Sequence, residues 1–244
     1  MVMADYGDDK CFTRGTLILL RHGSTEWNEK NWFTGWADVP LSARGIEEAR
    51  LAGRLIASAR IVPDVAYTSR LTRTIQTATI ALAAADCKRI EIHQSWRLNE
   101  RHYGALQGRD RDAALVEYGH DLLQLWRRSY NGTPPEANGD DTAAERVLPD
   151  EPGVPLPRAE SLKDVSVRLL PYWKEVVEQQ LRRGRTVLVV AHSNSLRAIV
   201  KHLEQISDED IIDLNIPIAI PLVYVFGREF HGMTGRYLAD ASLS

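Results

Sequence analysis

Hydrophobic runs of strand length alternate along the chain with segments in which apolar side chains recur at helical spacing. Strands are predicted at residues 16–20, 64–69, 89–94, 186–191 and 221–226. Helices are predicted at residues 42–59, 70–85, 109–118, 121–130, 161–183 and 195–205, and Ser69 is the expected N-cap of the second. This alternation is typical of a mostly parallel sheet with helices on both faces. We therefore expect an α/β protein with three layers, α/β/α.

Two segments fall outside this alternating pattern. Residues 1–15 are largely polar and predict a flexible N-terminal extension in front of a single domain at 16–244. Residues 131–157 are rich in Pro, Gly, Asp and Asn and contain little apolar material, so we expect a long surface loop. With 44% hydrophobic residues, the chain has enough apolar material to bury one large core.

Charge and cysteine content narrow the possible partners. The formal net charge of -3 provides no long-range positive field, so neither nucleic acid nor a membrane is expected as a partner. Cys11 and Cys87 lack metal-ligand or redox spacing, which argues against a zinc site or a disulfide framework. No apolar run approaches the roughly 20 residues of a membrane helix, and residues 1–10 lack the apolar core of a secretion signal. We expect a cytoplasmic protein.

A histidine follows each of two predicted strands that have the same form. His22 follows the strand in TLILLRHG, and His192 follows the strand in TVLVVAHSNS. If these strands are parallel neighbours, their carboxyl ends bring both histidines to one edge of the sheet, where α/β proteins bind ligands. Helix N-termini behind them would favour an anion. A single histidine here could equally be structural, and a metal site is disfavoured because no third ligand has suitable spacing.

Arginines near the same edge suggest the charge of the ligand. Arg21 precedes the first histidine, Arg73 lies one turn into a helix that follows a strand, and Arg127 and Arg128 form a pair in QLWRRSY. The pair could be an ordinary solvated helix face. Guanidinium groups also match phosphate oxygens in pairs of hydrogen bonds, so together these residues favour a small, multiply charged anion.

These residue types can carry phosphoryl transfer. A phosphoryl group held by Arg21, Arg73 and His192 would lie within reach of a neutral His22, which is a competent covalent nucleophile. Fixed cations can stabilise the transferred group without a metal ion. Glu100, in the irregular segment RLNERHYG, could move the proton of a substrate hydroxyl; alternatively it forms a surface ion pair with a neighbouring arginine.

Longer stretches of the sequence carry a family resemblance. The stretches are RHGSTEWN, NWFTGWADVPLSARG, AYTSRLTRTIQTA, WRLNERHYGALQG, WRRSYN with TPP, ESLKDV, AHSNSLRAIVKHLEQISDEDI, and LNIP with PLVY. RHG alone is a weak signal, whereas FTGW together with LNERHYGALQG is highly specific. Over nearly all of residues 16–240, the chain resembles the 2,3-bisphosphoglycerate-dependent phosphoglycerate mutases of the histidine phosphatase (RHG) superfamily.

The resemblance implies a phosphoglycerate mutase-like fold, a single catalytic domain at 16–244 and a set of residue roles. His22 would be the phosphorylated nucleophile, Glu100 the proton donor and acceptor, and His192 the stabiliser of the transferred group. Arg21 and Arg73 would assist His192. Substrate contacts are implied for Ser24, Thr25, Asn28, Thr34, Gly35, Arg101, Tyr103, Arg111, Arg127, Arg128, Ser193 and Asn194.

The implied reaction interconverts 3-phosphoglycerate and 2-phosphoglycerate in glycolysis and gluconeogenesis. The phosphorylated enzyme passes its group to the substrate, forms 2,3-bisphosphoglycerate and takes back the other phosphate. 2,3-Bisphosphoglycerate is the implied primer, and no metal is needed. Small-molecule phosphoglycerates are the expected partners, and the family usually forms homodimers or homotetramers.

Several positions depart from the family pattern. Ser193 stands where the family usually has glycine, and a serine at positive φ there would be uncommon and could displace the imidazole of His192. Ile218 and Ala219 stand where a threonine and a glycine are expected, and Arg111 replaces the more usual lysine.

Two alternatives to the mutase remain open. Thr25 keeps a hydroxyl where the bisphosphoglycerate synthase branch carries glycine, which favours the mutase. PRAESLKDV and HLEQISDEDI resemble eukaryotic members, which include that branch, so a bisphosphoglycerate synthase or phosphatase is one alternative. The other is a weakened binding protein that lost turnover through Ser193 and Ala219, although His22, Arg21, Arg73, Glu100 and His192 are all present.

Overall fold

A six-stranded, mostly parallel sheet forms the centre of the fold in the computed structural model, which describes residues 15–87, 89–137, 154–227 and 233–238. The strand order is β3-β2-β4-β1-β5-β6. The strands are β1 (Thr16–Arg21), β2 (Val65–Thr68), β3 (Ile92–Gln94), β4 (Thr186–Ala191), β5 (Leu222–Val225) and β6 (Arg236–Tyr237). All but the last residue of the expected N-terminal extension, 1–15, lies outside the described residues, as does much of the expected loop 131–157.

The pairing of the strands confirms the expected parallel neighbours. β1 pairs in parallel with β4, with Arg21 opposite Ala191, and β4 and β3 both pair in parallel with β2. β5 runs antiparallel to β1, and β6 antiparallel to β5. The residues that follow β1 and β4, His22 and His192, therefore emerge side by side at the carboxyl edge of the sheet.

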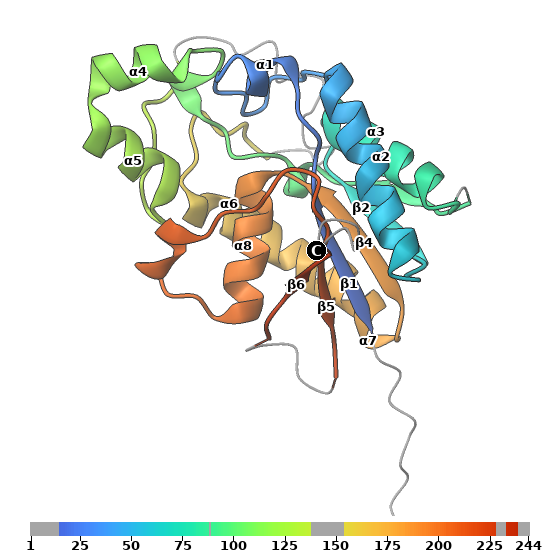
Figure 1. Cartoon of the computed structure of the whole chain (residues 1–244). Helices are drawn as coiled ribbons and strands as arrows, with labels where there is room; N and C mark the ends of the chain where they lie inside the picture. The colour runs from blue at the N-terminus through green and yellow to red at the C-terminus, as the bar shows by residue number, and fades with distance from the viewer. Residues whose placement is uncertain (1–14, 88, 138–153, 228–232, 239–244) are drawn as a thin grey trace, which may run out of the picture.

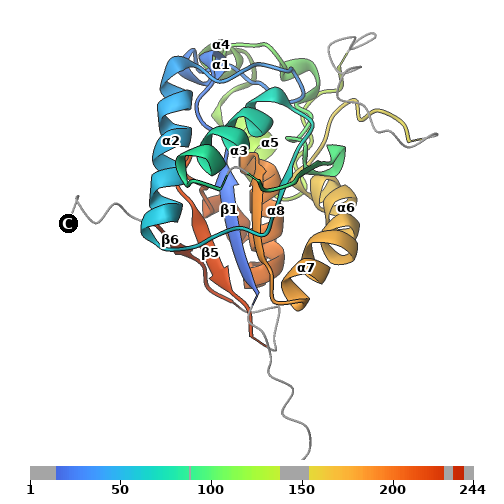
Figure 2. The same cartoon turned by 90° about the vertical axis from the view of Figure 1, so that its right-hand side faces the viewer.

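Helices cover both faces of this sheet, as the alternating pattern predicts (Figure 1 and Figure 2). On one face lie α2 (Ala43–Ser58) and α3 (Thr72–Ala84). On the other lie α6 (Leu162–Tyr172), α7 (Glu178–Arg182) and α8 (Ser193–Glu204). Residues of β1 alternate between the two cores: Leu17 and Leu19 pack with α6–α8, and Ile18 and Leu20 pack with α2 and α3. Because both sets are almost fully buried, the strand has no polar face.

Further short elements lie beyond the carboxyl ends of the strands. α1 (Glu26–Glu29) and α4 (Arg111–Tyr118) are at the top of both views, and α5 (His120–Arg128) follows α4 after Gly119 (Figure 1 and Figure 2). Single turns of 3-10 helix span Trp96–Leu98, Gly104–Leu106 and Asp210–Asp213. These elements and their loops form the walls above the sheet edge.

Local sequence explains where the long helices begin and how they continue. Ser42 caps α2 by accepting from the backbone N–H of Gly45. The expected capping role of Ser69 is wrong, because α3 begins after Leu71; the Ser69 hydroxyl instead accepts from the backbone N–H of Leu71. The predicted helix 161–183 is continuous but contains a π-helical segment, Trp173–Val177, between α6 and α7.

Within the described ranges, no helix is both long and apolar enough to cross a membrane.

Candidate active site

The two histidines lie together in the interior of the protein at the carboxyl edge of the sheet. The ring centroids of His22 and His192 are 5.0 Å apart, with the ring planes at 62°. His22 is 4% exposed and His192 is fully buried. Because their two strands are adjacent and parallel, the fold itself produces this pair, although 170 positions separate the residues in the sequence.

Hydrogen bonding fixes which nitrogen of His22 carries the proton. Nδ1 lies 2.7 Å from the carbonyl oxygen of Gly23, and because a carbonyl can only accept, Nδ1 must be the donor. In the neutral ring, Nε2 then has the free lone pair. Burial, followed by the charges of Arg73 and Arg21, holds the pKa of His22 well below its ordinary value. A neutral imidazole with a free Nε2 is the form in which histidine acts as a nucleophile.

A chain of hydroxyl groups fixes the second ring in a similar way. Thr74 Oγ1 donates to the carbonyl oxygen of Leu71 at 2.9 Å, so it accepts in its 2.7 Å contact with Ser69 Oγ. Ser69 has then used its proton and accepts from His192 Nε2 at 2.8 Å. His192 Nδ1 is buried without a hydrogen-bond partner. Burial, followed by the charge of Arg73, also holds the pKa of His192 well below its ordinary value, so this ring is neutral as well.

A carboxyl group lies beside the pair and is tied to the start of α8. Glu100 Oε1 accepts from the backbone N–H of Arg101 at 2.8 Å. It also accepts from the side-chain nitrogen of Asn194 at 3.0 Å and from the Asn194 backbone N–H at 3.3 Å. The same helix start follows His192, so Glu100 and the second histidine share one rigid support.

The two arginines next to the histidines are held by carbonyl oxygens. Arg21 donates to the carbonyl of Ile216 at 2.8 Å. Arg73 is fully buried and donates to the carbonyls of Ala37 at 2.8 Å and Gly35 at 2.7 Å. Burial lowers the pKa of Arg73 to about 10, which leaves it charged at neutral pH. Since carbonyls do not neutralise a cation, both arginines keep their charge available for an anion.

Gly35 supports Arg73 through a backbone conformation that favours glycine. Its φ is 55°, and a Cβ at this position would lie 2.1 Å from Oε1 of Gln107. Gln107 Oε1 in turn accepts from the backbone N–H of Trp36 at 2.7 Å. A side chain at position 35 would therefore be strained by this φ and would push the Gln107 amide away from the Trp36 backbone N–H.

These groups open onto a strongly cationic cavity of about 200 Å³. Among its described lining residues are six arginines but one carboxylate, Glu100. The cavity is lined by Arg21, His22, Asn28, Thr34, Gly35, Arg73, Glu100, Tyr103, Arg111, Arg127, Arg128, Ser193, Asn194, Arg197 and Asn215. Several of their polar atoms are buried without a hydrogen-bond partner, namely Nε of Arg21, Arg73, Arg111 and Arg197 and Oγ1 of Thr34. Such a surface suits a ligand with several anionic oxygens.

Four residues of the set identified from the sequence do not line the cavity: His192, Ser24, Thr25 and Arg101. The ring of His192 lies against the ring of His22, which does line the cavity. Ser24 donates from its backbone N–H and its hydroxyl to Glu48. Thr25 caps α1 through reciprocal hydrogen bonds with Asn28, and Arg101 is buried over the ring of Tyr103, 4.7 Å from its centroid. The last two therefore contact residues of the wall.

Two lining residues were missed by the sequence reasoning, Arg197 and Asn215. Arg197, on α8, donates to the carbonyls of Arg128 at 2.6 Å and Ile211 at 2.7 Å and to Asn194 Oδ1 at 3.0 Å. Burial lowers its pKa to about 10. Its position three residues after Asn194 on the same helix, at the i, i+3 spacing, was the signal that could have found it.

Two departures from the family pattern have different structural outcomes. Ser193 is the first residue of α8 and is absent from the described residues with positive φ, so the expected strain at this position does not arise. Ala219 does have positive φ, 53°, and its backbone N–H donates to the carbonyl of Arg21 at 3.1 Å. An alanine therefore occupies a conformation that favours glycine, one hydrogen bond away from the end of β1.

The arrangement can bind a polyanion and place one of its groups against a neutral histidine. In the part of the chain that the structure describes, no three His, Cys, Asp or Glu side chains are grouped so that they could hold a metal ion.

Comparison with known proteins agrees with this chemistry. The family model of the histidine phosphatase superfamily (branch 1) matches residues 17–149 and 142–228. A Clavibacter sepedonicus protein named 2,3-bisphosphoglycerate-dependent phosphoglycerate mutase is 52% identical, over 91% of this chain and 90% of its own. A Candida albicans phosphoglycerate mutase is 53% identical over 92% of both chains.

Solved structures show the same fold at low sequence identity. A structure titled mycobacterial hydrolase 1 aligns with a TM-score of 0.69 at 23% identity, over 92% of this chain and 96% of that one. The α-ribazole phosphatase from Shigella flexneri aligns with a TM-score of 0.66 at 22% identity, over 91% and 95%.

Proposed function

The chain belongs to the histidine phosphatase superfamily, branch 1, and we propose that it interconverts 3-phosphoglycerate and 2-phosphoglycerate through a phosphohistidine at His22, primed by 2,3-bisphosphoglycerate. Relatives more than 50% identical along nine-tenths of the chain are named as 2,3-bisphosphoglycerate-dependent mutases. The structural observation that carries the proposal is the neutral His22, with Nε2 free, on the wall of a cavity lined by six arginines.

The first part of the cycle is the transfer of a phosphoryl group to His22. The lone pair on His22 Nε2 attacks the phosphorus atom, and the bond from phosphorus to the departing oxygen breaks. Arg21 and Arg73 place fixed positive charge beside the transferred oxygens, where it stabilises the transition state. Because the guanidinium groups are already held by carbonyls, little reorganisation is needed when the group arrives.

His192 supports the same group by changing its charge. Its Nδ1 has no partner and, in the neutral tautomer, has no proton to donate. A bound phosphoryl group supplies negative charge nearby, which raises the pKa of His192. The ring can then take up a proton from solvent at Nδ1 and donate it in a hydrogen bond to a phosphoryl oxygen, while Nε2–H stays on Ser69.

Glu100 moves the proton of the substrate hydroxyl. When the substrate oxygen leaves phosphorus, the protonated carboxyl gives it a proton; in the reverse step, the carboxylate takes that proton as the oxygen attacks phosphohistidine. The contacts with Asn194 and Arg101 occupy Oε1 and leave the other carboxyl oxygen for this task. Glu100 also lines the cavity with His22.

The cavity fits the proposed primer and substrate. 2,3-Bisphosphoglycerate, when bound, supplies the phosphoryl group that first loads the enzyme. Arg111, Arg127, Arg128 and Arg197 would hold the remaining phosphate and the carboxylate, and the unpaired Nε atoms of Arg111 and Arg197 support this assignment. Asn28, Thr34 and Ser193 would complete the set of polar contacts.

The proposal extends to location and assembly. From the resemblance to the mutases, we propose that the protein is a cytoplasmic homodimer or homotetramer. Light scattering of the purified protein would test the assembly, and a monomer at working concentration would contradict it.

The direct test is turnover of 3-phosphoglycerate with and without 2,3-bisphosphoglycerate, in the presence of a chelator. We expect chelator-resistant conversion that the bisphosphate stimulates. His22→Ala should abolish the acid-labile phosphoenzyme while the protein stays folded, because position 22 lies at the sheet edge. Turnover retained by this variant would contradict the phosphohistidine mechanism. A wild-type protein that mainly makes or hydrolyses the bisphosphate would point instead to a synthase or phosphatase.

A further inference from the structure

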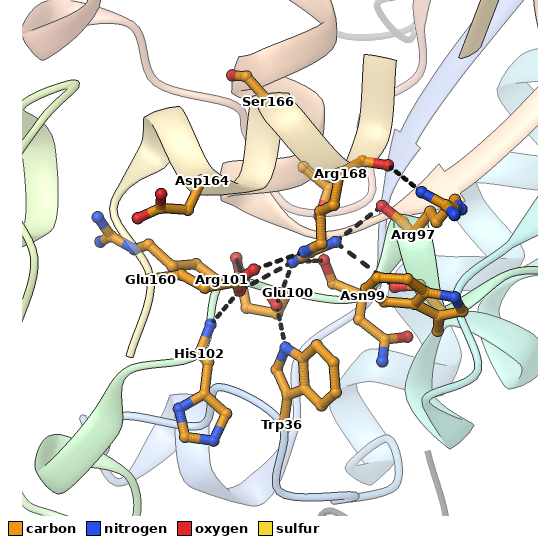
Figure 3. Close-up of polar contacts among 12 residues, drawn as sticks. Trp36, Arg97, Asn99, Glu100, Arg101, His102, Glu160, Asp164, Ser166 and Arg168 are labelled. Atoms are coloured by element: carbon orange, nitrogen blue, oxygen red, sulfur yellow. Dashed lines mark hydrogen bonds and ion pairs between the residues drawn. The ribbon is translucent and has the colours of Figure 1, made fainter. Parts of the chain in front are cut away.

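A buried arginine outside the cavity holds the loop that carries Glu100. Arg168 lies on α6 and reaches across to the backbone carbonyls of this loop (Figure 3). It donates to the carbonyl of Arg97 at 2.8 Å and to the carbonyls of Asn99 and Glu100, both at 3.0 Å. The indole N–H of Trp36 donates to the same Glu100 carbonyl at 2.5 Å. The backbone at position 100 is therefore fixed from two sides.

A buried carboxylate orients this arginine and binds the next part of the loop. Glu160 accepts from Arg168 Nε at 2.6 Å and from a terminal nitrogen of Arg168 at 3.0 Å (Figure 3). Its other contacts are with His102: Glu160 Oε2 accepts from the His102 backbone N–H at 2.8 Å, and the Glu160 N–H donates to the His102 carbonyl at 2.9 Å. Both side chains of the pair are less than one-tenth exposed.

Arg168 and Glu160 form a buried ion pair against this loop, in a position that apolar side chains could also fill. Replacing a buried ion pair with apolar residues is often neutral or stabilising, so stability alone does not account for the pair. What the pair supplies is direction, because the guanidinium group of Arg168 holds the carbonyls of Arg97, Asn99 and Glu100 in one arrangement. The last of these residues is Glu100, whose carboxyl oxygen must meet a substrate hydroxyl.

We propose that Arg168 and Glu160 are positioning residues that set the location of the Glu100 carboxyl for proton transfer. Neither lines the cavity, so they act through the loop and not on the substrate. The inference rests on the proposed role of Glu100 in the mutase reaction. A misplacement of about 1 Å at a catalytic group can cost on the order of 100-fold in rate, so a loosened loop has a measurable consequence.

The proposal predicts a dependence on the leaving group. Transfer from 2,3-bisphosphoglycerate to His22 releases an alkoxide, which needs the proton of Glu100. Transfer from p-nitrophenyl phosphate releases a phenolate that is stable as an anion near neutral pH and needs no proton. Loss of the Arg168 contacts should therefore slow the first reaction and leave the second nearly unchanged. General disruption of the site would slow both reactions together.

The experiment measures phosphoenzyme formation by rapid quench with each donor for wild type, Arg168→Lys, Arg168→Met and Glu100→Gln. We expect Arg168→Met to lower the rate with the bisphosphate by about 10- to 100-fold and to change the rate with p-nitrophenyl phosphate less than about 3-fold. Arg168→Lys should recover part of the loss, since it keeps the charge but not the fork. The Kd for inorganic phosphate should stay near that of wild type in both variants.

One further variant serves as a control, and another replaces Arg168→Met if that protein does not fold. Arg182→Met removes a partly exposed arginine that pairs with Glu178 on α7, away from the loop, and should leave both rates unchanged. If Arg168→Met does not fold because it leaves the Glu160 carboxylate unpaired, Glu160→Gln combined with Arg168→Met removes both charges of the buried pair together. In a Glu100→Gln background, an Arg168 substitution should add little to the bisphosphate defect, because the group that it positions is already gone.

Specific outcomes would overturn the positioning role. Equal slowing with both donors, or an Arg168 defect that multiplies fully with Glu100→Gln, would show that the pair acts on the site in general. An unchanged bisphosphate rate in folded Arg168 variants would also refute it. Failure of the proposed function looks different, because the wild type itself would then form no phosphoenzyme from the bisphosphate.

Discussion

The two buried histidines make folding stability depend on pH in a calculable way. Their pKa values in the folded chain lie well below the ordinary value near 6.5, chiefly because burial disfavours the charged rings. When the pH falls below 6.5, the unfolded chain takes up protons at these positions and the folded chain does not. Stability present at neutral pH is therefore lost as the pH falls towards the folded pKa values.

The size of this loss follows from the linkage relation. If His22 and His192 both stay neutral in the folded chain at pH 5.5, each lowers the free energy of unfolding by about 1.4 kcal/mol between pH 7.5 and 5.5. The two together account for about 2.7 kcal/mol of the total decrease. Other groups that titrate in this range add their own contributions, so the prediction concerns the difference between variants.

Urea unfolding followed by fluorescence at both pH values, in phosphate-free buffer, measures the decrease for each variant. In His22→Asn and in His192→Asn, the free energy of unfolding should fall by about 1.4 kcal/mol less between pH 7.5 and 5.5 than it does in wild type. His120→Asn is the matched control, because His120 is exposed on α5 and should leave the decrease unchanged. A decrease of equal size in wild type and in the double variant His22→Asn/His192→Asn would refute the reasoning.

Three further predictions concern single positions. Glu100→Gln should lower kcat by about 10²- to 10⁴-fold with little change in the Kd of 3-phosphoglycerate, and unchanged turnover with a raised KM would contradict its role. Arg73→Lys should weaken phosphate binding by about 10-fold or more in calorimetry, because lysine cannot hold the carbonyls of Gly35 and Ala37 in the same fork. Ala219→Val should lower the free energy of unfolding by about 1–2 kcal/mol in urea titrations, since a branched side chain fits poorly at φ 53°, whereas Ala219→Gly should stay within about 0.5 kcal/mol of wild type. Equal effects of the two Ala219 substitutions would show that backbone strain is unimportant there.

Periodicity in the sequence was sufficient to predict the long elements. After an initial threonine, the runs 17–20 and 187–191 are apolar at every position, which is the pattern of a strand buried on both faces. The four-residue helix α1 and the two-residue strand β6 were not predicted, because elements this short contain only about one period and show no repeat. Their formation depends on local caps and on pairing with β5.

The site was predicted where residues directly follow predicted strands, and it was missed where tertiary contacts alone bring residues together. His22 and His192 follow similar runs, so their pairing could be foreseen. Ser69 was wrongly predicted to cap a helix; its contact with His192 joins residues 123 positions apart, and no local pattern encodes that hydrogen bond. Likewise, the carbonyl-bound state of Arg197 depends on where α5 ends relative to α8.

The guanidinium groups in the cavity repel one another, which lowers the stability of the fold, while the proposed activity requires them. After burial, the charges of Arg111 and Arg101 lower the pKa of Arg127, and Arg127 in turn lowers the pKa of Arg128. The members of each pair repel one another in the ligand-free protein, and a bound anion reduces this repulsion. The ligand-free fold is therefore less stable than a neutral cavity would make it, and random mutagenesis selected only for heat resistance should remove these arginines first. Thermostable variants obtained without selection for turnover would then be the least active ones, and adding substrate during selection would protect the site.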